Sequence, residues 1–205
     1  PMIAHAISAA KCSGLFNKIV VSTDDDEIAQ VARDHGGEIP FVRPQKLADD
    51  ITPTIPVVRH AITECISLGY KFEYVCCIYP CVPLIQIEDL ELTLKKLEAS
   101  DVDFSFPVAE FPSKIERALN LNENGNVLPV KPAHQSTRTQ DLPAAYYDAG
   151  LFYWAHKQAW LDKTNIHENG VGSVIPGWRV ADIDTPDDLK RAELLYKLLS
   201  INGRL

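Results

Sequence analysis

Two aspartates near the end of the chain have the type and spacing for metal chemistry. Asp182 and Asp184 follow an apolar run and precede a helix start at Thr185 and Pro186. Alternate residues of an extended strand point to the same side, so the pattern predicts that both carboxylates share one face. Because neighbouring carboxylates repel each other, the pair suits Mg²⁺, which takes one or two carboxylates together with phosphate oxygens. The alternative is that Asp184 only favours the helix dipole while Asp182 is solvated.

Two loops in the first third of the chain add groups suited to a nucleotide. Residues 21–25 carry a strand end into a helix, where backbone amides meet a phosphate in many proteins. Arg43 follows a second short strand, and hydroxyl residues that include Thr54 come after it. An arginine at this place either clamps a phosphate or is a solvated surface base. The sequence contains neither GxGxxG nor GxxxxGKS/T, which disfavours a dinucleotide dehydrogenase and excludes a P-loop nucleotidase.

The elements that must position these groups alternate along the chain. Helical patterns occupy residues 2–13, 24–34, 55–68 and 87–99. Apolar strand patterns occupy residues 18–22, 38–42, 74–79, 103–108, 150–154 and 174–184. Such alternation predicts an α/β fold with a mostly parallel sheet and helices on both faces, with ligands at the carboxyl ends of the strands. Asp24 is expected to cap the second helix and Thr185 the last one.

Residues 110–142 interrupt this alternation. Two short β-like pieces, 118–121 and 127–130, flank the sequence Asn-Glu-Asn-Gly-Asn, which is typical of a hairpin. A polar stretch, 134–140, follows. We interpret residues 110–142 as an inserted arm that covers the active site or pairs subunits. A long surface loop is the alternative.

Composition narrows the class of protein. A chain of 205 residues is long enough for one domain with a substantial core, and its net charge of −8 argues against binding to nucleic acid or an anionic membrane. The longest apolar stretch, 74–85, contains two prolines and is too short to span a bilayer. Three of the five cysteines crowd this stretch without the spacing of a zinc site. They indicate reduced thiols in a cytoplasmic protein.

Several longer motifs follow one another from the start of the chain to near its end. They are Pro-Met-Ile-Ala-His at 1–5, VVSTDDDEIAQVA at 20–32, FVRP with LADDITPT within 41–54, IYPCVPL at 78–84, TRTQDLPAAYYDAGLFYW at 137–154 and DIDTPDDL at 182–189. Together they resemble the CMP-sialic acid synthetase group of cytidylyltransferases, and the segment 138–154 is most similar to its pseudaminic acid branch.

The resemblance implies a fold, a reaction and an assembly. The implied fold is a three-layer α/β/α Rossmann-like nucleotidyltransferase of the nucleotide-diphospho-sugar transferase type, a single domain over residues 1–205. The implied reaction transfers CMP from CTP to a nine-carbon 2-keto sugar acid, pseudaminic acid in this branch, and releases pyrophosphate. The implied assembly is a cytoplasmic homodimer joined through the arm. The family's phosphate loop, rich in glycine and in lysine or arginine, is expected ahead of Pro1 and so to be missing from this sequence.

The resemblance also assigns roles residue by residue. It implies that Asp182 and Asp184 bind Mg²⁺ and serve catalysis. Arg43 is implied to contact the nucleotide, and Thr54 lies where a hydroxyl residue reads the cytosine. Lys114 and Arg138 correspond to cations that face the sugar carboxylate.

Tyr79, also placed at the sugar, stands where sialic acid enzymes often carry glutamine, so other sugar acids stay open. CMP-sialic acid, legionaminic acid and Kdo synthetases of the same family are therefore alternatives. A different alternative is a catalytically silent binding or dimerisation module that lacks the phosphate loop.

Overall fold

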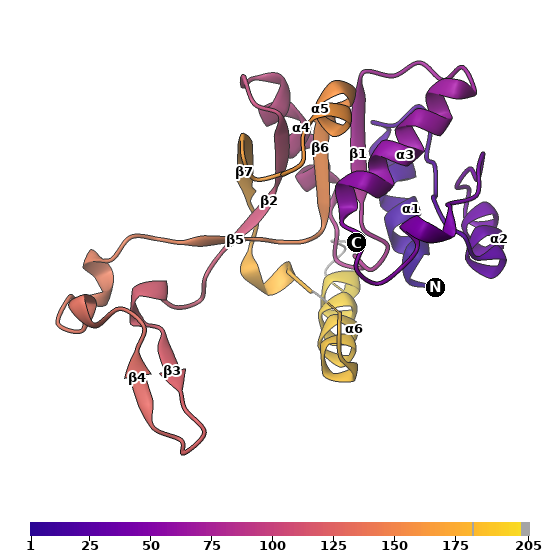
Figure 1. Cartoon of the computed structure of the whole chain (residues 1–205). Coiled ribbons are helices and arrows are strands. Elements are labelled where there is room, and N and C mark those ends of the chain that lie inside the picture. The colour runs from indigo at the N-terminus through magenta and orange to yellow at the C-terminus, as the bar shows by residue number, and fades with distance from the viewer. Residues whose placement is uncertain (182, 202–205) are drawn as a thin grey trace.

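A mixed β-sheet covered by helices on both faces forms the body of the protein in a computed structural model (Figure 1). The structure describes residues 1–181 and 183–201, without the side chain of residue 201. The helices are α1 (Met2–Ser13), α2 (Asp26–Asp34), α3 (Thr54–Ser67), α4 (Ile87–Glu98), α5 (Lys157–Asp162) and α6 (Pro186–Ile201). The strands are β1 (Tyr74–Ile78), β2 (Phe104–Glu110), β3 (Leu119–Leu121), β4 (Val127–Pro129), β5 (Tyr146–Asp148), β6 (Phe152–His156) and β7 (Gly170–Val174).

Local signals in the sequence account for the ends of the helices. Gly14 ends α1 with a left-handed φ of 66°, a conformation that glycine adopts without strain. The cap of α2 is Asp25, whose side chain accepts a hydrogen bond from Ile28 N, so the expected cap at Asp24 was wrong by one residue. Thr185 and Asp188 bond reciprocally at the start of α6, which confirms the predicted cap.

The alternation of side chains along β6 divides the interior into two cores. Phe152 and Trp154 join the core beneath α1 and α4, whereas Tyr153 and Ala155 join the core beneath α3 and α5. Because successive residues of a strand point to opposite faces, these helices cover the two sides of one sheet. The predicted three-layer arrangement is therefore confirmed.

The prediction of a mostly parallel sheet is wrong for the strands described. The order is β1-β6-β2-β5, with every neighbouring pair antiparallel, and β7 joins β2 in parallel. A strand that is covered on both faces has a continuously apolar sequence in a parallel and in an antiparallel sheet alike. Its composition therefore did not reveal its direction.

Three further strand predictions were wrong. Residues 18–22 and 38–42 meet only in one parallel bridge, Val20 with Glu38. The run 174–184 contains the last residue of β7 and then a 3₁₀ turn, Gly177–Arg179, because Pro176 lacks the N–H that a central ladder would use. Asp184 therefore does not lie on a strand, and Asp182 lies outside the described residues.

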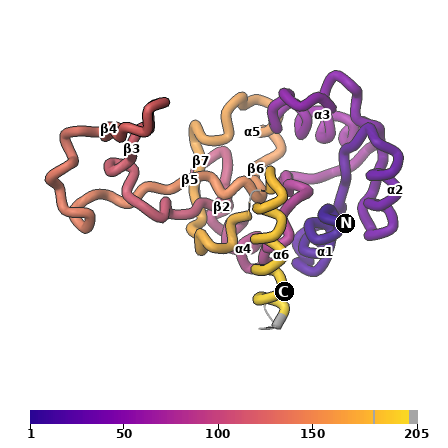
Figure 2. The backbone as a smooth tube through the Cα atoms, turned by 90° about the horizontal axis from the view of Figure 1, so that it is seen from below, coloured from indigo at the N-terminus to yellow at the C-terminus, as the bar shows by residue number. Residues whose placement is uncertain are grey.

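The hairpin predicted within 110–142 is confirmed as β3 paired with β4. Figures 1 and 2 show this hairpin projecting away from the sheet, at the opposite end of the molecule from α2. Of the helices described, none combines the length and the apolar character that crossing a bilayer requires.

Candidate functional site

Thr54 and Tyr79, which sequence analysis assigned separately, lie together in the structure. Thr54 is the first residue of α3, and Tyr79 directly follows β1. The Thr54 Oγ1 and Tyr79 OH atoms are 2.6 Å apart, and both side chains are half-buried. A helix start and a strand end thus meet at one point, as expected for a ligand site of an α/β sheet.

A second tyrosine, missed by sequence analysis, lies behind Tyr79. The rings of Tyr79 and Tyr153 pack edge to face with centroids 5.5 Å apart. The hydroxyl of Tyr153 donates to Asp148 Oδ2 at 2.9 Å. Burial raises the pKa of Tyr153 well above its ordinary value, and the charge of Asp148 raises it further. Tyr153 therefore stays a proton donor at physiological pH.

Asp148 is fixed by two further groups. Its Oδ1 accepts a hydrogen bond from Gly150 N at 2.9 Å, and its Oδ2 lies 2.7 Å from His167 Nε2. Gly150 has a left-handed φ of 63°, which a residue with a side chain would adopt only with strain. Because β5, β6 and the segment before β7 supply these groups, only the folded chain brings them together.

Arg43 is held against the loop that follows residue 21. Its Nε donates to Ser22 Oγ at 3.1 Å, its Nη2 donates to the Ser22 carbonyl, and its backbone N donates to Thr23 O at 2.9 Å. The guanidinium also lies near β1, because its charge lowers the pKa of the Cys77 thiol against the larger effect of burial, which raises it. The two loops expected to meet a nucleotide therefore lie side by side.

Lys114 and Arg138 lie in the arm. Lys114 Nζ is 3.4 Å from Glu110 Oε1, at the end of β2, and its side chain is 22% exposed. The side chain of Arg138 is exposed, just before a 3₁₀ turn at Thr139–Asp141. Within the part of the chain that the structure describes, no hydrogen bond or ion pair joins either cation to Thr54 or Tyr79. Their roles at the sugar acid stay predictions.

Asp184 lies exposed just before α6, and Asp182 lies outside the described residues. Over residues 1–181 and 183–201, no cluster of three histidine, cysteine or acidic side chains is suited to a metal ion. Within the same ranges, the Asp184 carboxylate forms no hydrogen bond or ion pair with another side chain. An exposed, uncommitted carboxylate fits Mg²⁺, which prefers hard oxygen ligands and keeps several waters.

Comparison with solved structures defines the fold class. A 4-diphosphocytidyl-2C-methyl-D-erythritol synthase from Anaerococcus prevotii superposes with a TM-score of 0.59 over 95% of this chain and 85% of that chain, at 12% sequence identity. The likeness shows that the two chains share a fold.

The family follows from the sequence comparisons. Residues 1–177 match the cytidylyltransferase family, and the chain belongs to it. The pseudaminic acid cytidylyltransferase of Campylobacter jejuni is 39% identical over 199 residues, which cover 97% of this chain and 86% of that protein. A Helicobacter pylori protein named pseudaminic acid cytidylyltransferase and UDP-2,4-diacetamido-2,4,6-trideoxy-beta-L-altropyranose hydrolase is 33% identical over 89% of this chain and 35% of its own length.

Proposed function

We propose that this chain transfers CMP from CTP to pseudaminic acid, a nine-carbon 2-keto sugar acid, and releases pyrophosphate. The observation that carries the proposal is the 39% identity to pseudaminic acid cytidylyltransferase over nearly the whole chain. The meeting of Thr54 with Tyr79 supports it, because one residue is assigned to the nucleotide and the other to the sugar acid. A transferase needs both substrates side by side.

Each side chain contributes through its charge or its hydrogen-bonding groups. Arg43 uses Nε and Nη2 to hold Ser22, so Nη1, which has no partner among the described residues, can donate to a phosphate oxygen. Thr54 meets the cytosine. Lys114 and Arg138 orient the sugar carboxylate by charge-assisted hydrogen bonds. The anomeric hydroxyl then attacks the α-phosphorus in line with the departing pyrophosphate.

Mg²⁺ is the proposed cofactor, and Asp184 together with Asp182 would hold it. When bound, the ion neutralises charge on the α-phosphate and on the pyrophosphate as it leaves. Asp184 lies just before the first turn of α6, beside the positive end of the helix dipole.

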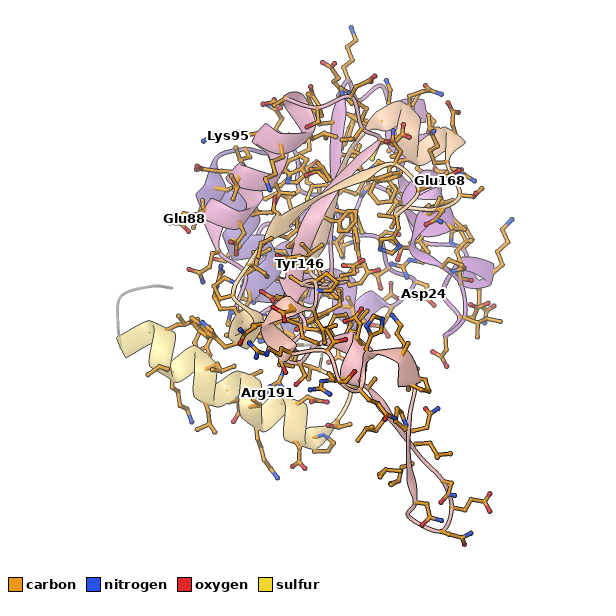
Figure 3. All side chains as sticks on the ribbon, turned by 90° about the vertical axis from the view of Figure 1, so that its left-hand side faces the viewer. Asp24, Glu88, Lys95, Tyr146, Glu168 and Arg191 are labelled. Atoms are coloured by element: carbon orange, nitrogen blue, oxygen red, sulfur yellow. The ribbon has the colours of Figure 1, made fainter. Side chains whose placement is uncertain are left out.

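The proposed assembly is a cytoplasmic homodimer formed through the arm, 110–142. The register pairs Leu121 with Val127 on one side of the hairpin, and their exposed fractions are 72% and 59%. Figure 3 shows the side chains of this hairpin well away from the body, beyond Tyr146 at the start of β5. An apolar hairpin in that position needs a covering surface, and a second copy supplies one.

Pyrophosphate release tests the reaction. The full-length protein is incubated with CTP, Mg²⁺ and one of four acids: pseudaminic acid, a legionaminic acid, N-acetylneuraminic acid or Kdo. We expect the highest kcat/KM with pseudaminic acid. A higher kcat/KM with another acid would show that the protein activates that sugar acid instead of pseudaminic acid. No release with any acid would favour a catalytically silent binding module.

A further inference from the structure

His167 belongs to the segment before β7, yet it contacts the sheet near the other end of β2. Its Nε2 atom lies 2.7 Å from Asp148 Oδ2. Asp148 pairs with Val108 near the end of β2, and Tyr79 directly follows β1. Since β1 and β2 are both antiparallel to β6, they run in the same direction. His167 is therefore held toward the carboxyl ends of these strands, where α/β sheets bind their ligands.

Aromatic contacts connect His167 to Tyr79. The ring of Phe106 packs against His167 with centroids 5.2 Å apart and against Tyr153 with centroids 5.8 Å apart. Tyr153 packs in turn on Tyr79, at 5.5 Å between centroids. The hydroxyl of Tyr153 also donates to Asp148 Oδ2, the oxygen that His167 contacts. Only the side chain of Tyr153 thus separates this imidazole from the residue assigned to the sugar acid.

The surroundings of Asp148 determine which nitrogen of His167 carries a proton. Asp148 Oδ1 accepts a hydrogen bond from Gly150 N, and Oδ2 accepts one from Tyr153 OH. An ionised carboxylate only accepts, so its bond with His167 uses a proton on Nε2. In the neutral imidazole, Nδ1 then carries a lone pair and no proton.

The Nδ1 atom of His167 is available to a ligand. Within residues 1–181 and 183–201, no hydrogen bond or ion pair joins it to another residue. The side chain is 57% exposed, although Asp148 and the ring of Phe106 hold it in place. Exposed ion pairs add little to stability, so a gain in stability does not account well for an imidazole oriented in this way.

We propose that His167 is a further sugar-acid-binding residue, whose Nδ1 accepts a hydrogen bond from a hydroxyl or N–H group of the sugar acid. Asp148 is its positioning residue. This inference rests on the proposed function, in which Tyr79 contacts the sugar acid. Lys114 and Arg138, assigned to the carboxylate, only donate hydrogen bonds. An acceptor at His167 therefore recognises groups of the sugar that those two cations cannot.

The test measures pyrophosphate release at saturating CTP and Mg²⁺ over a range of pseudaminic acid concentrations. His167→Phe keeps a ring against Phe106 and removes both nitrogens. We expect the KM for pseudaminic acid to rise about 5-fold or more, as for the loss of one hydrogen bond, while the KM for CTP stays the same. An unchanged KM for pseudaminic acid in this variant would overturn the inference.

Two further variants separate binding from a structural role of the contact with Asp148. His167→Gln brings an amide that can still donate to Asp148 but no imidazole nitrogen, so the KM for pseudaminic acid should rise as in His167→Phe. A KM restored to the wild-type value would show a structural role instead. Asp148→Asn can donate to Nε2 and so move the proton to Nδ1, and the same KM should rise. Should Asp148→Asn not fold, the two His167 variants decide the question alone.

His156 provides the matched control. Its Nδ1 lies 3.9 Å from Glu73 Oε1, its side chain is 43% exposed and its ring packs on Tyr74. The pairing of His156 with Tyr74 places it at the opposite end of β1 from Tyr79. His156→Phe and His156→Gln should therefore leave both KM values unchanged. A rise in the KM for pseudaminic acid as large as in the His167 variants would contradict a specific role of His167.

Calorimetric titration with pseudaminic acid, in the presence of CMP, separates failure of the inference from failure of the proposed function. A wild type that turns over, with an unchanged KM in the His167 variants, would overturn the inference alone. A wild type that binds pseudaminic acid without releasing pyrophosphate, and whose affinity falls about 5-fold in His167→Phe, would overturn only the proposed reaction. Equal affinity in that variant, or no binding and no turnover in wild type, would overturn both.

Discussion

The cysteines of β1 and α3 take their acid–base properties from burial. Burial raises the pKa of the Cys77 thiol to about 12, and the charge of Arg43 opposes only part of that rise. Burial also raises the pKa of Cys76 well above its ordinary value and that of Cys65 less strongly. Because the thiolate is the reactive form of cysteine, these three residues are not nucleophiles at physiological pH.

Thiol labelling measures this difference directly. With a disulfide reagent at pH 8, we expect rapid reaction only at Cys12 and Cys81, which are exposed. A raised thiol pKa leaves little thiolate at that pH, so Cys65, Cys76 and Cys77 should react slowly until the protein is unfolded. Three or more rapid thiols in the native protein would contradict the expectation.

Asp184 permits a matched comparison of two neighbouring carboxylates. Asp184→Asn should reduce kcat at least about 100-fold and weaken the dependence of the rate on Mg²⁺, because a metal ligand loses its charge. Asp187→Asn is the control, since Asp187 is also exposed at the start of α6 and pairs with Lys190. Equal losses in the two variants, or unchanged turnover in Asp184→Asn, would count against a metal role.

At the residue scale, the sequence identified individual side chains of the site better than it identified the contacts between them. The resemblance named Thr54 and Tyr79, and the structure brings their hydroxyls together. The residues around this pair could not be predicted. Tyr153 and Asp148 have the sequence pattern of ordinary strand residues, and His167 is distant from both along the chain. Nothing local therefore indicates that Tyr153 packs on Tyr79 or that Tyr153 and His167 both contact Asp148.

Among the elements, α4 is joined to the segment after β7 by a largely buried ion pair. Arg179 Nη1 and Nη2 contact the two oxygens of Asp89 at 2.5 and 3.0 Å, and the side chains are only 12% and 10% exposed. Asp89 also lies in the first turn of α4, where an acidic residue favours the helix dipole. The pair links the segment that leads toward Asp184 to the body of the sheet.

Denaturation of single and double variants tests the role of this pair. Arg179→Met leaves a buried, unpaired carboxylate and should lower the free energy of unfolding by about 3 kcal/mol. Adding Asp89→Leu should recover most of that loss, because no unpaired charge then remains. Lys190→Met, which breaks the exposed pair with Asp187, should change stability little. A double variant as unstable as the single one would show that packing, rather than charge, sets the cost.

Helices were more predictable than the sheet for a physical reason. The bounds of α3 and α4 differ from the predicted 55–68 and 87–99 by one residue at most, because caps and apolar faces are local signals. The direction of β6 depends instead on its partners, β1 and β2, which lie far away in sequence. No pattern within five residues encodes that choice.

Over the whole molecule, a net charge of −8 is unfavourable for an enzyme whose two proposed substrates are anions. In the proposed site, local positive charges offset this repulsion. They are Arg43 on the body of the protein, and Lys114 and Arg138 on the arm. A movement or loss of the arm would therefore change the sugar acid side of the site before the nucleotide side. In the proposed dimer, assembly through the arm and binding of the sugar acid would be coupled.

The oligomeric state provides the test at this scale. Leu119 and Leu121 lie on one side of β3, with 59% and 72% of their surfaces exposed, and a two-stranded hairpin is only marginally stable alone. We expect wild type to be a dimer by light scattering after gel filtration, and Leu119→Ser with Leu121→Ser to be a monomer with a raised KM for the sugar acid. Leu194→Ser is the control, because Leu194 is 68% exposed on α6, outside the arm, and its change should leave the dimer intact. A dimer that survives the double substitution, or a monomeric wild type, would exclude the arm as the interface.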